Sequence, residues 1–172
     1  MSLTTQPTNL NFLSPLGFKL TLARAPTTVF FLQNISIPGI SMSETYQPTP
    51  FVKIPRPGDH IDYGELSVTF KVDEDLSNWL EVYNWMLSLG FPDNFDQYKL
   101  LGKAAKGSQE TVSSDITVTI LNSAMNPNVE FQFKDAFPTT ISQLDLGSTS
   151  TDVDYVTATA TFRYRIYEIT KL

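Results

Sequence analysis

The chain has 172 residues, of which 41% are hydrophobic and 12% aromatic, and this length and composition predict one globular domain and exclude a disordered chain. Its net charge of −6 and its 12 scattered Lys and Arg residues argue against the basic face that a protein needs to bind a phosphate backbone. It has no cysteine, which excludes a disulfide framework and a thiolate metal site.

The first part of the chain reads as an arm followed by two strands. Residues 1–11 are polar and include a proline, so we expect a flexible N-terminal arm. Apolar residues at every second position predict a first strand within 12–22. A turn at 25–28 then leads to a second, more continuously apolar strand over 29–37.

The stretch 41–60 holds four prolines among apolar and basic residues. Because proline cannot donate to a central ladder, the pattern predicts an extended arm or an edge hairpin. A long surface loop and an interaction arm both fit this pattern. Long irregular loops are uncommon unless functional, which favours the interaction arm. The residues expected to make its contacts are Tyr46, Phe51, Ile54 and Arg56.

A strand and then a helix follow. Residues 61–72 alternate between apolar and polar side chains, with Gly64 as a possible bulge. Asp73 is a candidate N-cap for a helix at about residues 74–89, which Gly90 ends. One stripe of this helix is expected to pack on the core rather than to bind a cofactor, and it consists of Leu76, Trp79, Leu80, Tyr83, Met86 and Leu87.

The second half returns to strands. An irregular connection is expected over 91–109, and the alternating runs 114–121 and 129–134 predict a hairpin. A capped turn and short strand are expected over 136–146, followed by a polar turn at 147–154.

The segment Tyr155–Ile166 carries apolar or aromatic residues at its even positions and mostly Thr or Arg at its odd ones. This period predicts a single strand about 40 Å long with one face on the core, which requires a long neighbouring strand. The whole pattern indicates a mainly β protein with one helix.

The sequence offers little for catalysis. With one histidine and no cysteine, the segment 59–62 (Asp-His-Ile-Asp) reads as a solvated loop rather than a catalytic centre. The acidic clusters 73–75 and 152–154 fit a helix start and a turn better than a calcium loop. We therefore predict a protein that is not an enzyme, with no catalytic, cofactor-binding or metal-binding residues.

Several segments, taken in order, resemble the tail tube protein family of contractile-tailed phages, which is related to baseplate tube-initiator proteins and to the type VI secretion tube protein. The segments are Phe18–Leu20, Val29–Gly39, the proline-rich arm, Tyr63–Asp73 running into the Trp79–Trp85 helix, Phe137–Leu146 and Val156–Tyr164. The resemblance covers residues 12–168 and is most specific at Phe137–Leu146. It implies a single domain over 1–172, built as a β-barrel or β-sandwich of antiparallel sheets flanked by one helix at about residues 74–89.

For function, the resemblance implies hexameric rings that stack through the arm at 41–60 into a hollow conduit for DNA inside a contractile sheath. The implied partners are copies of the chain, sheath and baseplate proteins, and DNA that passes without specific binding. The implied location is the virion tail, after assembly in the host cytoplasm. No cofactor is implied.

Two further expectations concern the ring. The final strand should pair with a strand of a neighbouring subunit, which would cover a free sheet edge. Thr157, Thr159 and Thr161 are the candidates to face the lumen, because a neutral or acidic wall lets DNA pass where a basic wall would hold it. Arg163 and Arg165 share that face, and we expect them near the rim or paired with carboxylates of a neighbouring subunit.

Other functions remain open from the sequence. A baseplate tube-initiator or adaptor of the same fold is one, and a monomeric β-rich ligand-binding module is another. No apolar run approaches the roughly 20 residues that span a bilayer, so no membrane partner is expected. The mass of the protein in solution would separate a ring-former from a monomer.

Overall fold

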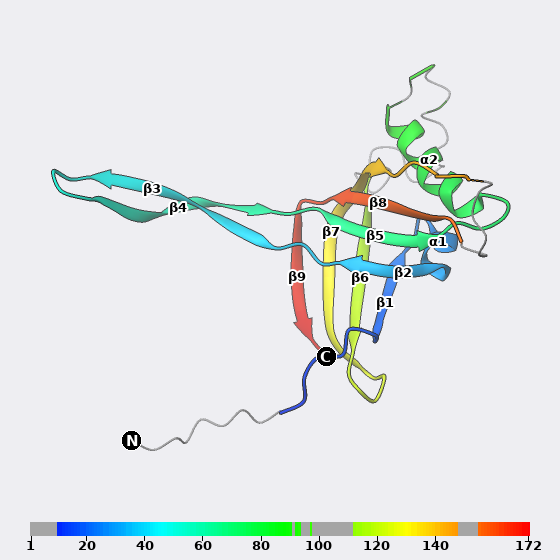
Figure 1. Cartoon of the computed structure of the whole chain (residues 1–172), viewed down its shortest axis with the longest axis horizontal. Coiled ribbons are helices and arrows are strands. Elements are labelled where there is room, and N and C mark those ends of the chain that lie inside the picture. The colour runs from blue at the N-terminus through cyan, green and yellow to red at the C-terminus, as the bar shows by residue number, and fades with distance from the viewer. Residues whose placement is uncertain (1–9, 91, 94–96, 98–111, 148–154) are drawn as a thin grey trace.

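The computed structural model describes residues 10–90, 92–93, 97, 112–147 and 155–172, and its elements are shown in Figure 1. In chain order they are β1 (Phe18–Leu22), α1 (Pro26–Phe30), β2 (Leu32–Ser36), β3 (Ile40–Pro48), β4 (Lys53–Tyr63), β5 (Leu66–Lys71), α2 (Ser77–Gly90), β6 (Ser114–Leu121), β7 (Pro127–Ile141), β8 (Thr157–Arg163) and β9 (Ile166–Lys171). Every strand pair is antiparallel. The prediction of a mainly β fold with a flanking helix is confirmed.

The body consists of two sheets that share β7. The first part of β7 lies between β6 and β9, and its last part pairs with β8. One sheet therefore runs β1-β6-β7-β9 and the other runs β7-β8-β5-β2. In Figure 1 the strands of the first sheet run across those of the second. Strands β3 and β4 form a separate two-stranded ladder that projects from the body.

The core lies between the two sheets, where the alternating patterns place it. Leu66, Val68 and Phe70 of β5 are buried, and so are the residues that lie opposite them on β8, which are Phe162, Ala160 and Ala158. The first sheet contributes further buried apolar residues, among them Leu20, Ile116, Val118 and Phe133. Helix α2 closes one end, with the ring of Trp85 6.1 Å from that of Phe162. The stripe expected to pack on the core is only partly right: Trp79 and Met86 pack against the core, but Leu76, Leu80 and Tyr83 are exposed. The buried face of α2 is instead rotated onto Val82 and Trp85.

The prediction of one uninterrupted strand over Tyr155–Ile166 is wrong. The segment divides into β8 and β9, which together follow β7 in one register: Arg163 lies opposite Phe137, and Ile166 lies opposite Lys134. The chain bends between these pairs because it passes from one sheet to the other. The expected long neighbour does exist, since β7 has 15 residues and includes the start of the 136–146 segment that was expected to be separate.

Helix α1 stands where a turn and the start of a strand were expected. Its N-terminal amides are satisfied from elsewhere in the chain, because Oε2 of Glu81 accepts hydrogen bonds from the backbone N–H groups of Thr27 at 3.1 Å and Thr28 at 3.4 Å. This contact offsets the low helix propensity of two threonines and a valine, and β2 consequently begins only at Leu32.

Helix α2 begins at Ser77, three residues later than predicted. Leu76 has a φ of 57°, which is incompatible with a right-handed helix at that residue. Asp73 still accepts a hydrogen bond from the backbone N–H of Asn78 at 3.4 Å, so it ties down the helix start from a position outside it.

The expectations for residues 1–9, for most of 91–109 and for 148–154 lie outside the described residues. Within the described part of the chain, neither helix is long and apolar enough to cross a membrane.

Candidate assembly surfaces

Strands β3 and β4 form an arm that extends from the body in Figure 1. The prediction of an extended arm or edge hairpin is confirmed, with the ladder running over Ile40–Tyr63 rather than 41–60. The register shifts between Met42 and Glu44, where the backbone of Gly58 packs against Ser43. A Cβ at Gly58 would lie 2.2 Å from Oγ of Ser43 and 2.5 Å from its carbonyl oxygen, so this irregularity requires glycine.

The four predicted contact residues of the arm are all exposed, but they do not form one surface. Tyr46 lies opposite Pro55, whereas Ile54 and Arg56 lie opposite Gln47 and Thr45 on the other face of the ladder. Phe51 lies at the tip between the strands and is 98% exposed. Arg56 donates from its Nε and from one terminal guanidinium nitrogen to Oε1 of Gln47, at 3.2 and 3.1 Å, which holds its guanidinium along the arm.

The structure adds three apolar residues to the arm that sequence reasoning missed. Ile40, Met42 and Ile61 are exposed, and the register places them on the same face of the ladder as Tyr46. The period-2 spacing of Ile40, Met42 and Tyr46 is the sequence signal that predicts this face. On this face the apolar residues share the surface with Glu44, whose carboxylate accepts a hydrogen bond from the Tyr46 hydroxyl.

A surface that we call the hydroxyl face covers the outer side of β2, β5, β8 and the end of β7. By register it consists of Asn34, Ser36, Ser67, Thr69, Thr140, Thr157, Thr159 and Thr161, with Lys71 at its edge opposite Thr157. The hydroxyl groups of Thr69 and Thr159 lie 3.0 Å apart, within hydrogen-bonding distance. The three predicted lumen residues Thr157, Thr159 and Thr161 are thus together on one side of the sheet, opposite the core.

Charged side chains bordering this face have partners. Arg163 pairs with Glu65 at 2.7 Å, and Nζ of Lys71 lies 4.4 Å from the centroid of the Tyr155 ring. Arg165 pairs with Asp135 at 2.7 Å. The arginines were expected near the rim or paired with carboxylates of a neighbouring subunit; both have carboxylate partners in the same chain, and a position near the rim stays a prediction. The face therefore presents mainly neutral hydroxyl groups.

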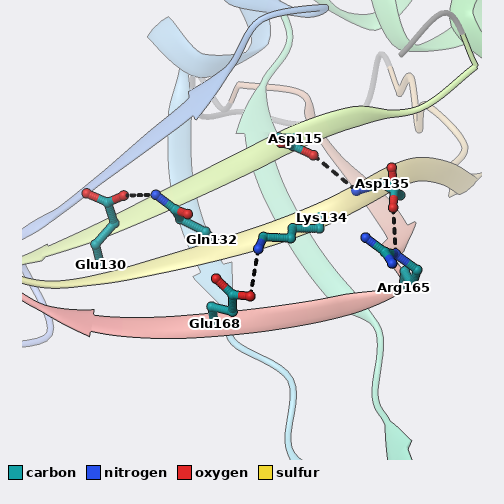
Figure 2. A network of polar contacts seen from close by, with 7 residues as sticks. All are labelled: Asp115, Glu130, Gln132, Lys134, Asp135, Arg165 and Glu168. Carbon is teal, nitrogen blue, oxygen red and sulfur yellow. Dashed lines mark hydrogen bonds and ion pairs between the residues drawn. The ribbon is translucent and has the colours of Figure 1, made fainter. Parts of the chain in front are cut away.

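The outer side of the other sheet carries a network of charges, shown in Figure 2. Lys134 bonds Glu168 at 2.6 Å, and Gln132 donates to Glu130 at 2.6 Å. The backbone N–H of Asp135 donates to Asp115 at 3.1 Å. By register, Thr21, Thr117, Thr119 and Thr170 lie on this same side, so the outer side of the first sheet mixes ionic groups with hydroxyl groups.

The histidine considered as a catalytic base lies on the arm. His60 contacts Asp59 at 2.5 Å, and both side chains are well exposed, as expected, but they belong to strand β4 and not to a loop. Burial raises the pKa of Tyr164 to about 12, with a smaller contribution from the nearby Tyr167 and Tyr63, and this tyrosine lies in an aromatic cluster at the base of the arm. Among the described residues no cluster of three or more His, Asp and Glu is arranged to hold a metal ion.

Comparison with known proteins identifies the family. Residues 22–170 match the phage tail tube protein family. The chain is 30% identical over 162 residues to the tail tube terminator protein of Enterobacteria phage T4, which covers 90% of this chain and 87% of that protein.

Solved structures share the fold. The chain superimposes on the tube terminating cap of the anti-feeding prophage with a TM-score of 0.63 and 14% identity, over 100% of both chains. It also matches a chain of the sheath/tube terminator structure of an extracellular contractile injection system, PVC, with a TM-score of 0.58 and 13% identity, over 94% of this chain and 99% of the other. The matched relatives are structural tail proteins, so the prediction that the chain is not an enzyme is confirmed.

These matches agree with the resemblance found in the sequence and add the terminator to it. The chain belongs to the phage tail tube protein family and is a tail tube or tube-terminator-like protein.

Proposed function

We propose that the chain forms a hexameric ring that ends a phage tail tube and leaves its channel open to DNA. The observation that carries this proposal is the 30% identity to a tail tube terminator over 87% of that protein's length. A match over nearly the full length of both proteins supports a shared role better than a match to an isolated segment would.

The free sheet edges support closure into a ring. Among the described strands, β1 pairs only with β6, β9 only with β7, and β2 only with β5. Each of these strands leaves backbone N–H and C=O groups that a neighbouring subunit can pair. A ring with a central hole requires two different contact surfaces per subunit, and unlike edges on one chain satisfy that need. The expected pairing of the final strand with a neighbouring subunit is not possible for β8, because β5 and β7 already pair with its two sides.

The hydroxyl face is the proposed channel wall. DNA carries about one negative charge per 1.7 Å of helix axis, and a basic wall would bind it through the release of counterions. Thr157, Thr159 and Thr161 offer neutral groups, and the guanidinium of Arg163 is already neutralised by Glu65. Such a wall would be hydrated and would not bind the DNA tightly.

The arm is the proposed contact between rings. An isolated two-stranded ladder is marginal in water, and this one exposes Ile40, Met42, Tyr46 and Phe51. Burying those side chains against another subunit would stabilise both the arm and the stack. The proposed partners are further copies of the chain or tube subunits, together with sheath and baseplate proteins, in a virion tail assembled in the host cytoplasm.

A second candidate is a subunit repeated along the tube. It is favoured by the match of residues 22–170 to the tail tube family and by a TM-score of 0.56 to a chain of a PVC sheath-tube complex. Labelling the chain in intact particles separates the two roles, because a terminator is found at one end only and a tube subunit along the whole length. Label confined to the baseplate end would instead identify a tube initiator.

Electron cryomicroscopy of the purified assembly tests the ring symmetry and the position of the hydroxyl face. We expect six-fold rings with Thr159 and Thr161 on the inner wall. A monomer that never associates with tubes would refute the ring, and rings with the hydroxyl face turned outward would refute its role as channel wall.

A further inference from the structure

The arm continues the β2–β5 pair in the same register. Ser36 of β2 lies opposite Ser67 of β5, and Ile40 of β3 lies opposite Tyr63 of β4, so residues 37–39 on one strand match residues 64–66 on the other. The paired ladder is interrupted between these two points, although the register is kept. The arm and this part of the body are therefore one long β-ribbon with a break at the base of the arm.

The residues at this break are suited to bending. Pro38 has no N–H group to donate across it. The backbone N–H of Gly64 donates to the carbonyl oxygen of Gly39 at 3.0 Å, and a Cβ at Gly64 would lie 3.2 Å from that oxygen. Gly39 has no atom within 4 Å of its Cβ position. Hinges consist of a few positions at the ends of elements that absorb changes in φ and ψ, and we call residues 37–39 and 64 the hinge.

The strand is fixed on the body side of the hinge. Oε1 of Glu65 accepts a hydrogen bond from Nε of Arg163 at 2.8 Å and lies 2.7 Å from a terminal nitrogen of the same guanidinium. The next residue, Leu66, is fully buried and pairs with Phe162 of β8. Because the chain is held from Glu65 onward, any change in the direction of the arm must occur at the hinge.

On the arm side of the hinge, one side chain packs on the body. The ring centroid of Tyr63 lies 6.0 Å from that of Tyr164 and 5.5 Å from that of Tyr167, both with edge-to-face geometry. In Figure 1 the arm leaves the body beside the junction of β8 and β9, where Tyr164 lies. Other large apolar side chains of the arm are exposed, namely Ile40, Met42, Tyr46, Phe51, Val52, Ile54 and Ile61. Aromatic contacts of this kind are individually modest, so they can hold the arm and still open.

The packed position of Tyr63 leaves one polar group unsatisfied. The hydroxyl of Tyr164 is buried and has no hydrogen-bond partner among the described residues. Burial is the main cause of its raised pKa, and the nearby phenol groups of Tyr167 and Tyr63 add to the rise. A buried hydroxyl without a partner destabilises the state that buries it, and departure of Tyr63 would open this hydroxyl to water.

We propose that the arm turns as one piece about the hinge, and that the ring of Tyr63 is a latch that holds the arm in one direction while it packs against Tyr164 and Tyr167. The arm then has a latched and a free state, and neither sheet of the body unfolds when the arm changes between them. This inference concerns a single chain and does not depend on the proposed ring.

Spin labels measure the direction of the arm. The chain has no native cysteine, so Val52→Cys at the tip and Lys19→Cys on β1 define one label pair, and both positions are exposed. Pulsed electron paramagnetic resonance then gives the distribution of distances between the labels, in single subunits diluted with unlabelled chain. We expect one narrow distribution in the otherwise unmodified chain and a broader, shifted one after Tyr63→Ala. Tyr63→Phe, which keeps the ring, should restore the narrow distribution.

Two controls separate a released latch from general damage. Ile61→Ala removes an exposed apolar side chain from the same face of β4 and should leave the distribution narrow. A second label pair within the body, Lys19→Cys with Asn84→Cys, should give the same distance with and without Tyr63→Ala, because only the arm moves. Tyr164→Phe removes the unsatisfied hydroxyl and should not broaden the distribution of the arm pair.

The proposal has clear contrary outcomes. An equally narrow distribution after Tyr63→Ala would show that the ribbon is rigid without the latch. A distribution that is already broad in the unmodified chain, or that Ile61→Ala broadens as much, would show that Tyr63 does not hold the arm. Each of these results would overturn the latch and leave the proposed ring and terminator role untouched.

Discussion

Arg165 donates from Nε to Oδ2 of Asp135 at 2.7 Å, across the bend where the β8–β9 segment passes from one sheet to the other. Asp135 has a φ of 56°, in the left-handed region, and its backbone N–H is held by Asp115. The pair thus sits at the corner that joins the two sheets through β7. We expect the backbone conformation of Asp135 to affect folding stability more than its charge, because exposed ion pairs contribute little to stability.

Variants at Asp135 separate the effect of its backbone conformation on stability from the effect of its charge. Asp135→Asn tolerates the left-handed conformation and should cost at most about 1 kcal/mol for the lost ion pair. Asp135→Ala should cost about 1 kcal/mol more, because alanine is strained there. Arg165→Ala, which removes only the ion pair, is the control. Urea unfolding measures all three, and equal stability of the Asn and Ala variants would show that the conformation is not strained.

Asn78 should be the most sensitive polar residue of α2. It is fully buried, and its Nδ2 donates to the carbonyl oxygen of Lys71 at 2.7 Å, which ties the helix to the end of β5. Asn78→Ala leaves that carbonyl unpaired and should cost about 1–3 kcal/mol in unfolding free energy. Asn84→Ala, an exposed change on the same helix, should stay within about 0.5 kcal/mol. Similar losses from both variants would argue against a specific role for Asn78.

Gly58→Ala should alter the arm but not the body. The new Cβ would collide with Ser43, whereas Gly39 has no atom within 4 Å of its Cβ position and Gly39→Ala is the matched control. We expect the main unfolding transition of Gly58→Ala to match that of the unmodified chain, with changed amide shifts confined to β3 and β4. Assembly should weaken in this variant alone. Unchanged arm resonances would contradict the close packing at the irregularity.

The raised pKa of Tyr164 predicts that the folded state loses stability at alkaline pH. Burial is the main reason that its pKa rises from 10.0 to about 12, so the folded state favours the protonated hydroxyl. The stabilisation is complete below about pH 10 and is lost as pH rises through 12. Its hydroxyl has no hydrogen-bond partner among the described residues, so Tyr164→Phe should be as stable as the unmodified chain or more so at neutral pH.

The control for that variant is Tyr83→Phe on the outer side of α2, which should keep the alkaline loss of the unmodified chain. Unfolding free energies measured from pH 8 to pH 12 would reveal the difference. If Tyr164→Phe loses stability over this range as steeply as Tyr83→Phe, the alkaline sensitivity comes from another group.

The arm variant Phe51→Ser with Ile54→Ser should leave the body folded and block stacking. Both side chains belong to the separate β3–β4 ladder and neither is part of the core, so the thermal midpoint of the body should not move. Sedimentation should show loss of stacked assemblies. Replacing Leu80 by Ser, an exposed apolar residue on α2, controls for a general loss of surface apolarity. Normal stacking by the double variant would show that the arm does not make the contact between rings.

The local sequence determined which side chains face the core. Alternation in β5 and β8 correctly placed Leu66, Val68, Phe70, Ala160 and Phe162 inside, because successive side chains of any strand point to opposite faces. It also placed Thr157, Thr159 and Thr161 together on the outer side, and the prolines correctly indicated an arm outside the main sheets. These features depend only on neighbours within a few residues.

Contacts between residues far apart in the sequence determined helix α1, the division of the final strand and the choice of strand partners. Helix α1 exists where the sequence favoured a turn because Glu81, more than fifty residues away, accepts hydrogen bonds from its first amides. The final strand divides because β7 turns the corner between the sheets at Asp135, a constraint that no pattern within Tyr155–Ile166 contains. Strand partners, and therefore which edges remain free for a neighbour, depend on such long-range pairing, and only the tertiary structure specifies them.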